Sequence, residues 1–106
     1  MIPQKTIEEL ILKHSSLEKD LSSGKIDKKL FAEKSKEYSD VNEIIGNAKK
    51  YVSFQKEKEE LEKILSDVSS DQELKKMAEL ELTELKIQRE INEKKLKLFL
   101  LPKDEA

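Results

Sequence analysis

The sequence predicts an all-α fold: an elongated three-helix bundle in which a short first helix packs on a long, antiparallel, coiled-coil-like helical hairpin. The 106 residues include only two glycines and two prolines, whereas turn-rich β folds need many of both. Charged residues make up 42% of the chain and apolar residues 36%, while about 25% of an average globular domain is charged. Apolar residues recur every three or four positions, which is the helical period. We therefore expect a thin core between long helices.

The first helix is expected over residues 3–22. Its mostly apolar face, with spacings of three and four residues, comprises Ile7, Leu10, His14, Leu17 and Leu21. Pro3 suits the first turn of a helix, and Thr6 with Glu9 predicts a capping box. The Ser-Ser-Gly run that follows should end the helix, because Gly24 can adopt the left-handed conformation of a C-terminal cap.

The second helix is expected over residues 28–67, with Asp27 as its N-terminal cap. The spacing of three and four residues continues through Ile44, Asn47, Tyr51, Phe54, Lys58, Leu61, Leu65 and Val68. At 1.5 Å per residue this helix would be roughly 58 Å long. Gly46 is its weak point, since glycine costs about 1 kcal/mol relative to alanine inside a helix. The sequence is compatible with a bend there and also with a continuous helix.

The third helix is expected over residues 71–100, after a break of short polar residues that compete with helical hydrogen bonds. Ser70 with Glu73 predicts a second capping box. Its first apolar stripe comprises Leu74, Met77, Ala78, Leu82 and Leu85, and an adjoining stripe comprises Ile87, Ile91 and Leu98. A short break between two long helices favours an antiparallel hairpin.

Composition excludes several classes of protein. The absence of cysteine rules out disulfides, a thiolate nucleophile and cysteine metal sites. The N-terminal stretch MIPQKTIEEL lacks a signal-peptide pattern, and no window approaches 18 consecutive apolar residues, so no membrane span is expected. Arg89 is the sole arginine among 21 basic residues, whereas sequence-specific DNA readers rely on arginine. We expect a soluble, cytoplasmic protein that binds neither DNA nor membrane.

Candidate chemical groups are few. His14 is the only histidine, and a metal site would need further ligands at suitable spacing. Crowded carboxylates occur at Glu57, Glu59, Glu60 and Glu62 and again at Glu79, Glu81 and Glu84. Both groups are interleaved with lysine or leucine, which is typical of solvated helix faces, and raised pKa values would require burial. We therefore assign no catalytic, cofactor-binding or metal residue and expect no enzyme.

One basic cluster is a candidate binding site. A possible RNA- or ribosome-facing patch comprises Lys49, Lys50, Lys56 and Lys58. Basic residues beside aromatic ones can bind RNA through phosphate contacts and base stacking. The neighbouring aromatics Tyr51 and Phe54 fall on the apolar stripe, however, which favours a role in the core.

Three stretches together resemble the N-terminal domain of the bacterial peptide chain release factor 1 family. They are KSKEYSDV at residues 34–41, DQELKKMAELELTEL at 71–85 and LFLLPKDEA at 98–106. The resemblance spans the whole chain, and it rests on the order and spacing of the three stretches. The resemblance implies a helical domain over residues 1–101. Residues 102–106 would then begin a linker to a codon-reading domain and a Gly-Gly-Gln domain, neither of which the chain contains.

The resemblance also implies a function. The family terminates translation at UAA and UAG by promoting peptidyl-tRNA hydrolysis on the ribosome. This domain would be a non-catalytic accessory part that contacts the large-subunit stalk base and the class II release factor. The resemblance assigns no contact residue and no cofactor.

Two other interpretations stay open. The spacing of three and four residues, with charged outer faces, is also typical of a free-standing coiled-coil adaptor or homodimerisation module. In that case the apolar end at residues 99–101 could mediate self-association. The basic patch alone would fit a helical RNA-binding arm, whose affinity would fall steeply with salt.

Overall fold

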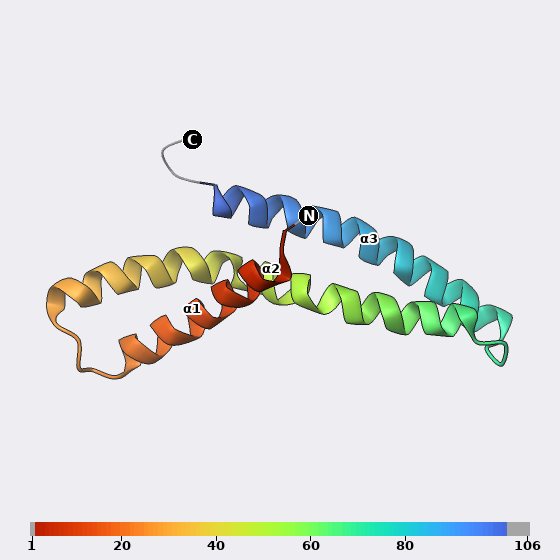
Figure 1. The fold of residues 1–106 in the computed structure, drawn as a ribbon, viewed down its shortest axis with the longest axis horizontal. Helices are drawn as coiled ribbons and strands as arrows, with labels where there is room; N and C mark the ends of the chain where they lie inside the picture. The colour runs from red at the N-terminus through yellow and green to blue at the C-terminus, as the bar shows by residue number, and fades with distance from the viewer. Residues whose placement is uncertain (1, 102–106) are drawn as a thin grey trace.

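The computed structural model describes residues 2–101, and the predicted linker at 102–106 lies outside the described residues. Three helices are present: α1 (Gln4–Ser22), α2 (Lys28–Ser66) and α3 (Gln72–Leu100), with no strand in the described part of the chain. The molecule measures 61 × 33 × 19 Å. The predicted elongated, all-α three-helix fold is confirmed (Figure 1).

Both other helices pack against the long helix α2. Figure 1 shows α1 antiparallel to the first part of α2 and α3 antiparallel to its second part. The backbones of α1 and α3 do not adjoin anywhere in residues 2–101. Two interhelical ion pairs, Lys13–Glu37 at 2.9 Å and Lys34–Asp20 at 2.6 Å, join α1 to α2. The bundle is thus two helix pairs placed end to end along one shared helix.

The start of α1 differs from the sequence expectation. The helix begins at Gln4 behind Pro3, and no side chain caps it. The backbone N–H groups of Thr6 and Ile7 instead donate to the Pro3 carbonyl at 3.1 and 3.4 Å. The predicted Thr6–Glu9 capping box is therefore wrong, because Thr6 already lies inside the first turn. The other end follows the expectation: α1 ends at Ser22, and Gly24 adopts a left-handed φ of 69°.

Two aspartates cap the long helices. Oδ1 of Asp27 accepts hydrogen bonds from Lys29 N at 2.8 Å and Leu30 N at 3.3 Å, as predicted. At the start of α3, Oδ1 of Asp71 accepts from Leu74 N at 2.8 Å. The predicted Ser70–Glu73 capping box is wrong, because Ser70 belongs to the preceding turn and donates its N–H to the Asp67 carbonyl at 3.2 Å.

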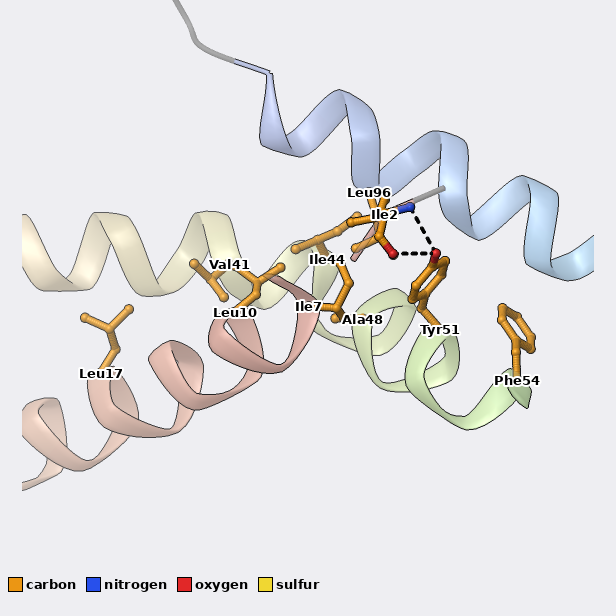
Figure 2. Close-up of a cluster of buried hydrophobic side chains, with 10 residues drawn as sticks. All are labelled: Ile2, Ile7, Leu10, Leu17, Val41, Ile44, Ala48, Tyr51, Phe54 and Leu96. Carbon is orange, nitrogen blue, oxygen red and sulfur yellow. Dashed lines mark hydrogen bonds between the residues drawn. The ribbon is translucent and has the colours of Figure 1, made fainter. Parts of the chain in front are cut away.

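No break interrupts α2 at Gly46. The helix is continuous from Lys28 to Ser66, and Figure 1 shows it bowed near its middle. The main core cluster lies at this level, where the three helices meet (Figure 2). Its buried members are Ile2, Ile7, Leu10, Leu17, Val41, Ile44, Ala48, Tyr51, Phe54 and Leu96. Ile7 of α1 and Leu96 of α3 are completely buried, so this cluster joins the two helix pairs.

Candidate nucleic-acid interface

The four lysines of the predicted basic patch do not share one face of α2. Lys49, Lys50 and Lys56 are exposed, whereas Lys58 is half-buried. At 3.6 residues per turn, Lys49 and Lys56 lie on the same side and Lys50 lies about 100° away. Lys58 points to roughly the opposite side, toward α3. The structure therefore separates Lys58 from Lys49 and Lys56, and Lys50 lies between the two sides.

The aromatic residues of the predicted patch are in the core. Tyr51 and Phe54 are only 7% and 6% exposed, and their rings meet edge to face with centroids 6.4 Å apart. The Tyr51 hydroxyl also bonds to the backbone of Ile2 at the helix junction (Figure 2). The favoured core role of both residues is confirmed. Base stacking on these rings is excluded in the folded chain, which leaves contacts to phosphate as the available chemistry.

Lys58 belongs to a different cationic group, made jointly by α2 and α3. Lys58, Lys86 and Arg89 line one pocket around the side chains of Phe54 and Leu85. Lys58 and Arg89 are half-buried, and none of the three cations makes an ion pair within residues 2–101. We call this site the cationic groove. Its charges come from two helices, so the hairpin must form before they converge.

Arg89 extends the cationic groove along the molecule. It also lines a neighbouring pocket, together with Ile2, Gln4, Tyr51 and Gln55. Arginine presents a planar fork of donors that matches a phosphate better than the point charge of lysine. The chain therefore places its only arginine between two adjoining pockets, where an anionic ligand could reach it.

Sequence reasoning missed Lys86 and Arg89. Their spacing of three residues places both on one side of α3, beside the apolar stripe that includes Leu85. The available signal was the use of arginine at one position in a chain that otherwise uses lysine. Arg89 can be recognised as a candidate binding residue only once the register of α3 against α2 is known.

The opposite flank of the same hairpin is acidic. A second groove between α2 and α3 is lined by Glu57, Glu60, Glu81 and Glu84, and Lys50 lines it as well. All four carboxylates are exposed, in agreement with the expectation of solvated faces. The hairpin thus presents two grooves of opposite charge, and an anionic polymer would be attracted to the cationic groove.

His14 is a packing residue of the α1–α2 interface. It is 9% exposed, its ring stacks on Tyr38 with centroids 4.9 Å apart, and its Nε2 lies 2.9 Å from Oδ1 of Asn42. Its Nδ1 lies 3.9 Å from a Glu18 carboxylate oxygen. No cluster of three or more histidine, cysteine, aspartate or glutamate residues in the described part of the chain could hold a metal ion.

Comparison with known proteins assigns this arrangement to a family. The PCRF domain model matches residues 10–106 of the chain. The chain belongs to the PCRF domain family. This finding confirms the resemblance on which the sequence interpretation relied.

Related proteins match most or all of the chain. The chain is 71% identical over 106 residues to Peptide chain release factor 1 of Pelagibacter ubique, covering 100% of the chain and 30% of that relative. Proteins of the same name from Wolbachia pipientis and Orientia tsutsugamushi are 38% and 35% identical. Those matches cover 96% and 92% of the chain, and 29% and 27% of the relatives. The chain therefore spans less than a third of the length of these relatives.

Two further comparisons are negative. No solved structure was found to match the chain. Among residues 2–101, none of the three helices has the length and apolar character needed to cross a membrane.

Proposed function

We propose that the chain is a non-catalytic accessory domain of a peptide chain release factor, which helps that factor to engage the ribosome. The observation that carries this proposal is the 71% identity, over all 106 residues, to the longer Pelagibacter ubique protein named Peptide chain release factor 1. The factor would act in the cytoplasm and terminate translation at UAA and UAG by promoting peptidyl-tRNA hydrolysis. Residues 1–101 would form the domain and 102–106 the start of its linker.

The chemistry of hydrolysis would lie outside this chain. His14, the only histidine, is buried against Tyr38 and Asn42. The crowded glutamates on α2 and α3 are exposed to solvent. The domain would therefore contribute binding and positioning.

The cationic groove supplies the ribosome contact in this proposal. Lys58, Lys86 and Arg89 face one pocket with no acidic partner within the described residues. A phosphate of ribosomal RNA would satisfy these donors, and arginine can bind it through two parallel hydrogen bonds. The exposed Lys49, Lys50 and Lys56 would add longer-range attraction. The target would be the large-subunit stalk base, with the class II release factor as a second partner.

A chimera tests the proposal. The matching segment of the Pelagibacter ubique relative is replaced by this chain, and peptide release is measured on ribosomes that present UAA, UAG or UGA. The chimera should release peptide at UAA and UAG within about tenfold of the unaltered relative, and not at UGA. A folded chimera without release at UAA and UAG would contradict the assignment to this factor.

Variants of the cationic groove in the same chimera test the contact separately. Lys86→Gln with Arg89→Gln should raise the factor concentration needed for half-maximal release, and leave the rate at saturation unchanged. Lys75→Gln with Lys76→Gln is the matched control, because it removes the same charge elsewhere on α3. Equal effects of the two pairs would rule out a specific contact in the groove.

A further inference from the structure

Arg89 lies on the side of α3 that packs against α2. That side comprises, at steps of four, three, four and three residues, Leu85, Arg89, Asn92, Leu96 and Phe99. Asn92 and Leu96 are buried, and Leu85 and Phe99 pack against the core cluster. A charged side chain at such a position must direct its guanidinium out of the interface, because a buried charge without a partner is costly. The neighbours of the Arg89 stem therefore decide where its charge lies.

The segment that leads into α1 lies beside Arg89. We call residues 2–4 of this segment the N-terminal strap. Ile2 and Gln4 of the strap line one pocket together with Arg89 and Tyr51. The cationic groove adjoins Arg89 through a different pocket, which the strap does not line. Arg89 is half-buried between the two, so the strap borders the arginine on one side and leaves the groove open.

The polar groups of the strap have partners other than Arg89. The Tyr51 hydroxyl accepts from the Ile2 N–H at 3.2 Å and donates to the Ile2 carbonyl at 2.9 Å (Figure 2). The Pro3 carbonyl accepts from the first turn of α1, and the Gln4 side-chain amide donates to a glutamate one turn further along that helix. Arg89 itself makes no hydrogen bond or ion pair within residues 2–101. Its donors are therefore available to an anion.

The strap has a docked and a released state. Chain ends detach locally unless packing or hydrogen bonds hold them, and here the burial of Ile2 and its two bonds to Tyr51 hold the strap, since no side chain caps α1. Release removes Ile2 and Gln4 from the side of Arg89, whose stem then gains rotamers that turn the charge away from the groove. Fixing a flexible side chain on binding costs entropy, so the docked state should bind an anion more tightly.

We infer that the N-terminal strap positions Arg89 for anion binding in the cationic groove, and that a phosphate bound there in turn holds the strap on Tyr51. The two effects are equal in size, because coupling between two equilibria is reciprocal. The strap joins the start of α1 to the core cluster that contains Leu96 of α3, so a bound phosphate would also stiffen the junction of the two helix pairs. The inference rests on the proposed function only in treating the groove as an anion site. Its tests use the 106-residue chain without ribosomes, so the two can fail separately.

Amide hydrogen exchange followed by NMR measures the coupling. The probe is inorganic tripolyphosphate, which carries phosphate charges without a base and is compared with sodium chloride at equal ionic strength. Saturating tripolyphosphate should slow exchange of the Ile2 N–H at least about fivefold. Exchange of the Ser69 N–H, which is bonded to Asp67 in the distant α2–α3 turn, should stay unchanged. Arg89→Gln should abolish the slowing at Ile2.

Ile2→Ala tests the coupling in the reverse direction. It weakens docking of the strap and leaves the groove residues in place, so the affinity for tripolyphosphate, measured by titration calorimetry, should fall severalfold. Leu12→Ala is the matched control at an exposed apolar site of α1 and should leave the affinity unchanged. If Ile2→Ala lost its helices by circular dichroism, the exchange experiment on the unaltered chain would decide alone.

Two results would overturn the inference, and they differ in what they imply for the groove. Exchange of the Ile2 N–H that tripolyphosphate leaves unchanged, in a chain that binds it through Arg89, would disprove the coupling and keep the groove as an anion site. Binding of tripolyphosphate that does not depend on Arg89 would disprove the coupling and remove Arg89 from the anion site.

Discussion

The Tyr51 hydroxyl makes hydrogen bonds to both backbone polar groups of Ile2. It accepts from the Ile2 N–H at 3.2 Å and donates to the Ile2 carbonyl at 2.9 Å (Figure 2). Ile2 and Tyr51 are 6% and 7% exposed, so little water can replace these bonds. The contact ties the segment before α1 to the middle of α2, where Leu96 of α3 also packs.

Tyr51→Phe should therefore destabilise the fold without creating a cavity. It leaves a buried N–H and a buried carbonyl without partners, which costs about 1–3 kcal/mol of unfolding free energy. Urea denaturation followed by circular dichroism measures the difference. Tyr38→Phe is the matched control, since the Tyr38 hydroxyl makes no hydrogen bond within residues 2–101 and its ring would still stack on His14. A smaller loss for Tyr51→Phe than for Tyr38→Phe would count against this account.

A polar pair inside the hairpin should set the register of α3 on α2. The Asn47 side-chain amide donates to Oδ1 of Asn92 across the interface, and Asn92 is only 4% exposed. Asn92→Leu alone should cost about 1–3 kcal/mol, because Asn47 loses its partner. The double variant Asn47→Leu with Asn92→Leu should recover most of that loss, as for other buried polar pairs replaced by apolar residues.

The same double variant should regain stability but lose the single register of α3 on α2, because a buried asparagine pair fixes the register of paired helices. Amide NMR spectra would then show more than one set of signals for α3. A double variant as destabilised as the single variant, with one set of signals, would contradict a register role for the pair.

A pH titration tests the turn between α2 and α3. The Asp67 carboxylate accepts hydrogen bonds from the Ser69 hydroxyl at 2.7 Å and from the Ser69 N–H at 2.9 Å. These bonds, the hydroxyl first, hold the pKa of Asp67 below its ordinary value of 3.8. Burial opposes the lowering, and the charge of Lys75 makes the smallest contribution to it. Because the folded pKa is depressed, the ionised carboxylate stabilises the turn above the unfolded pKa. That contribution is lost as pH falls through the folded pKa.

Ser69→Ala should raise the pKa of Asp67 toward 3.8, since it removes the hydroxyl bond and leaves the backbone bond. Carbon NMR of the side-chain carboxyl follows the titration directly. Ser66→Ala is the control, because the Ser66 hydroxyl donates to the Lys63 carbonyl instead. A pKa of Asp67 that Ser69→Ala leaves unchanged would disprove the assigned cause.

Salt dependence tests the cationic groove as a phosphate site. Binding of the chain to a ribosomal RNA fragment of the stalk base should weaken as salt rises, because bound cations release counterions from the RNA. Arg89→Gln should reduce the slope of log affinity against log salt by about one. Lys76→Gln, an exposed lysine of α3 outside the groove, should leave the slope unchanged. Equal slopes for the unaltered chain and Arg89→Gln would remove Arg89 from the contact.

Local spacing predicts most of this fold. The intervals of three and four residues that include Ile7 and Leu10 place both residues in the core, because helical periodicity alone decides which side of α1 is apolar. The roles of Gly24 and Asp27 were also predictable from the local sequence, because a left-handed backbone favours glycine and an aspartate carboxylate is a good N-terminal cap.

The choice between neighbouring capping residues was harder to predict, and so were the contacts between helices. Ser70 and Asp71 are both good N-terminal capping residues for α3. Which of the two caps the helix depends on the residue at which the preceding turn ends. Lys58 and Arg89 are 31 positions apart in the sequence, so their convergence depends on the register of α3 against α2. Pairs such as Asn47–Asn92 set that register, and no local pattern reveals it.

The most direct test of the central claim is peptide release by the Pelagibacter ubique relative from which the segment matching this chain has been removed. The concentration of factor needed for half-maximal release at UAA should rise at least tenfold, whereas the rate of hydrolysis at saturation and the choice of stop codon should stay unchanged. That result would assign the domain to ribosome engagement. Complete loss of codon-dependent release at saturation, with the remaining protein folded, would contradict a non-catalytic, accessory role.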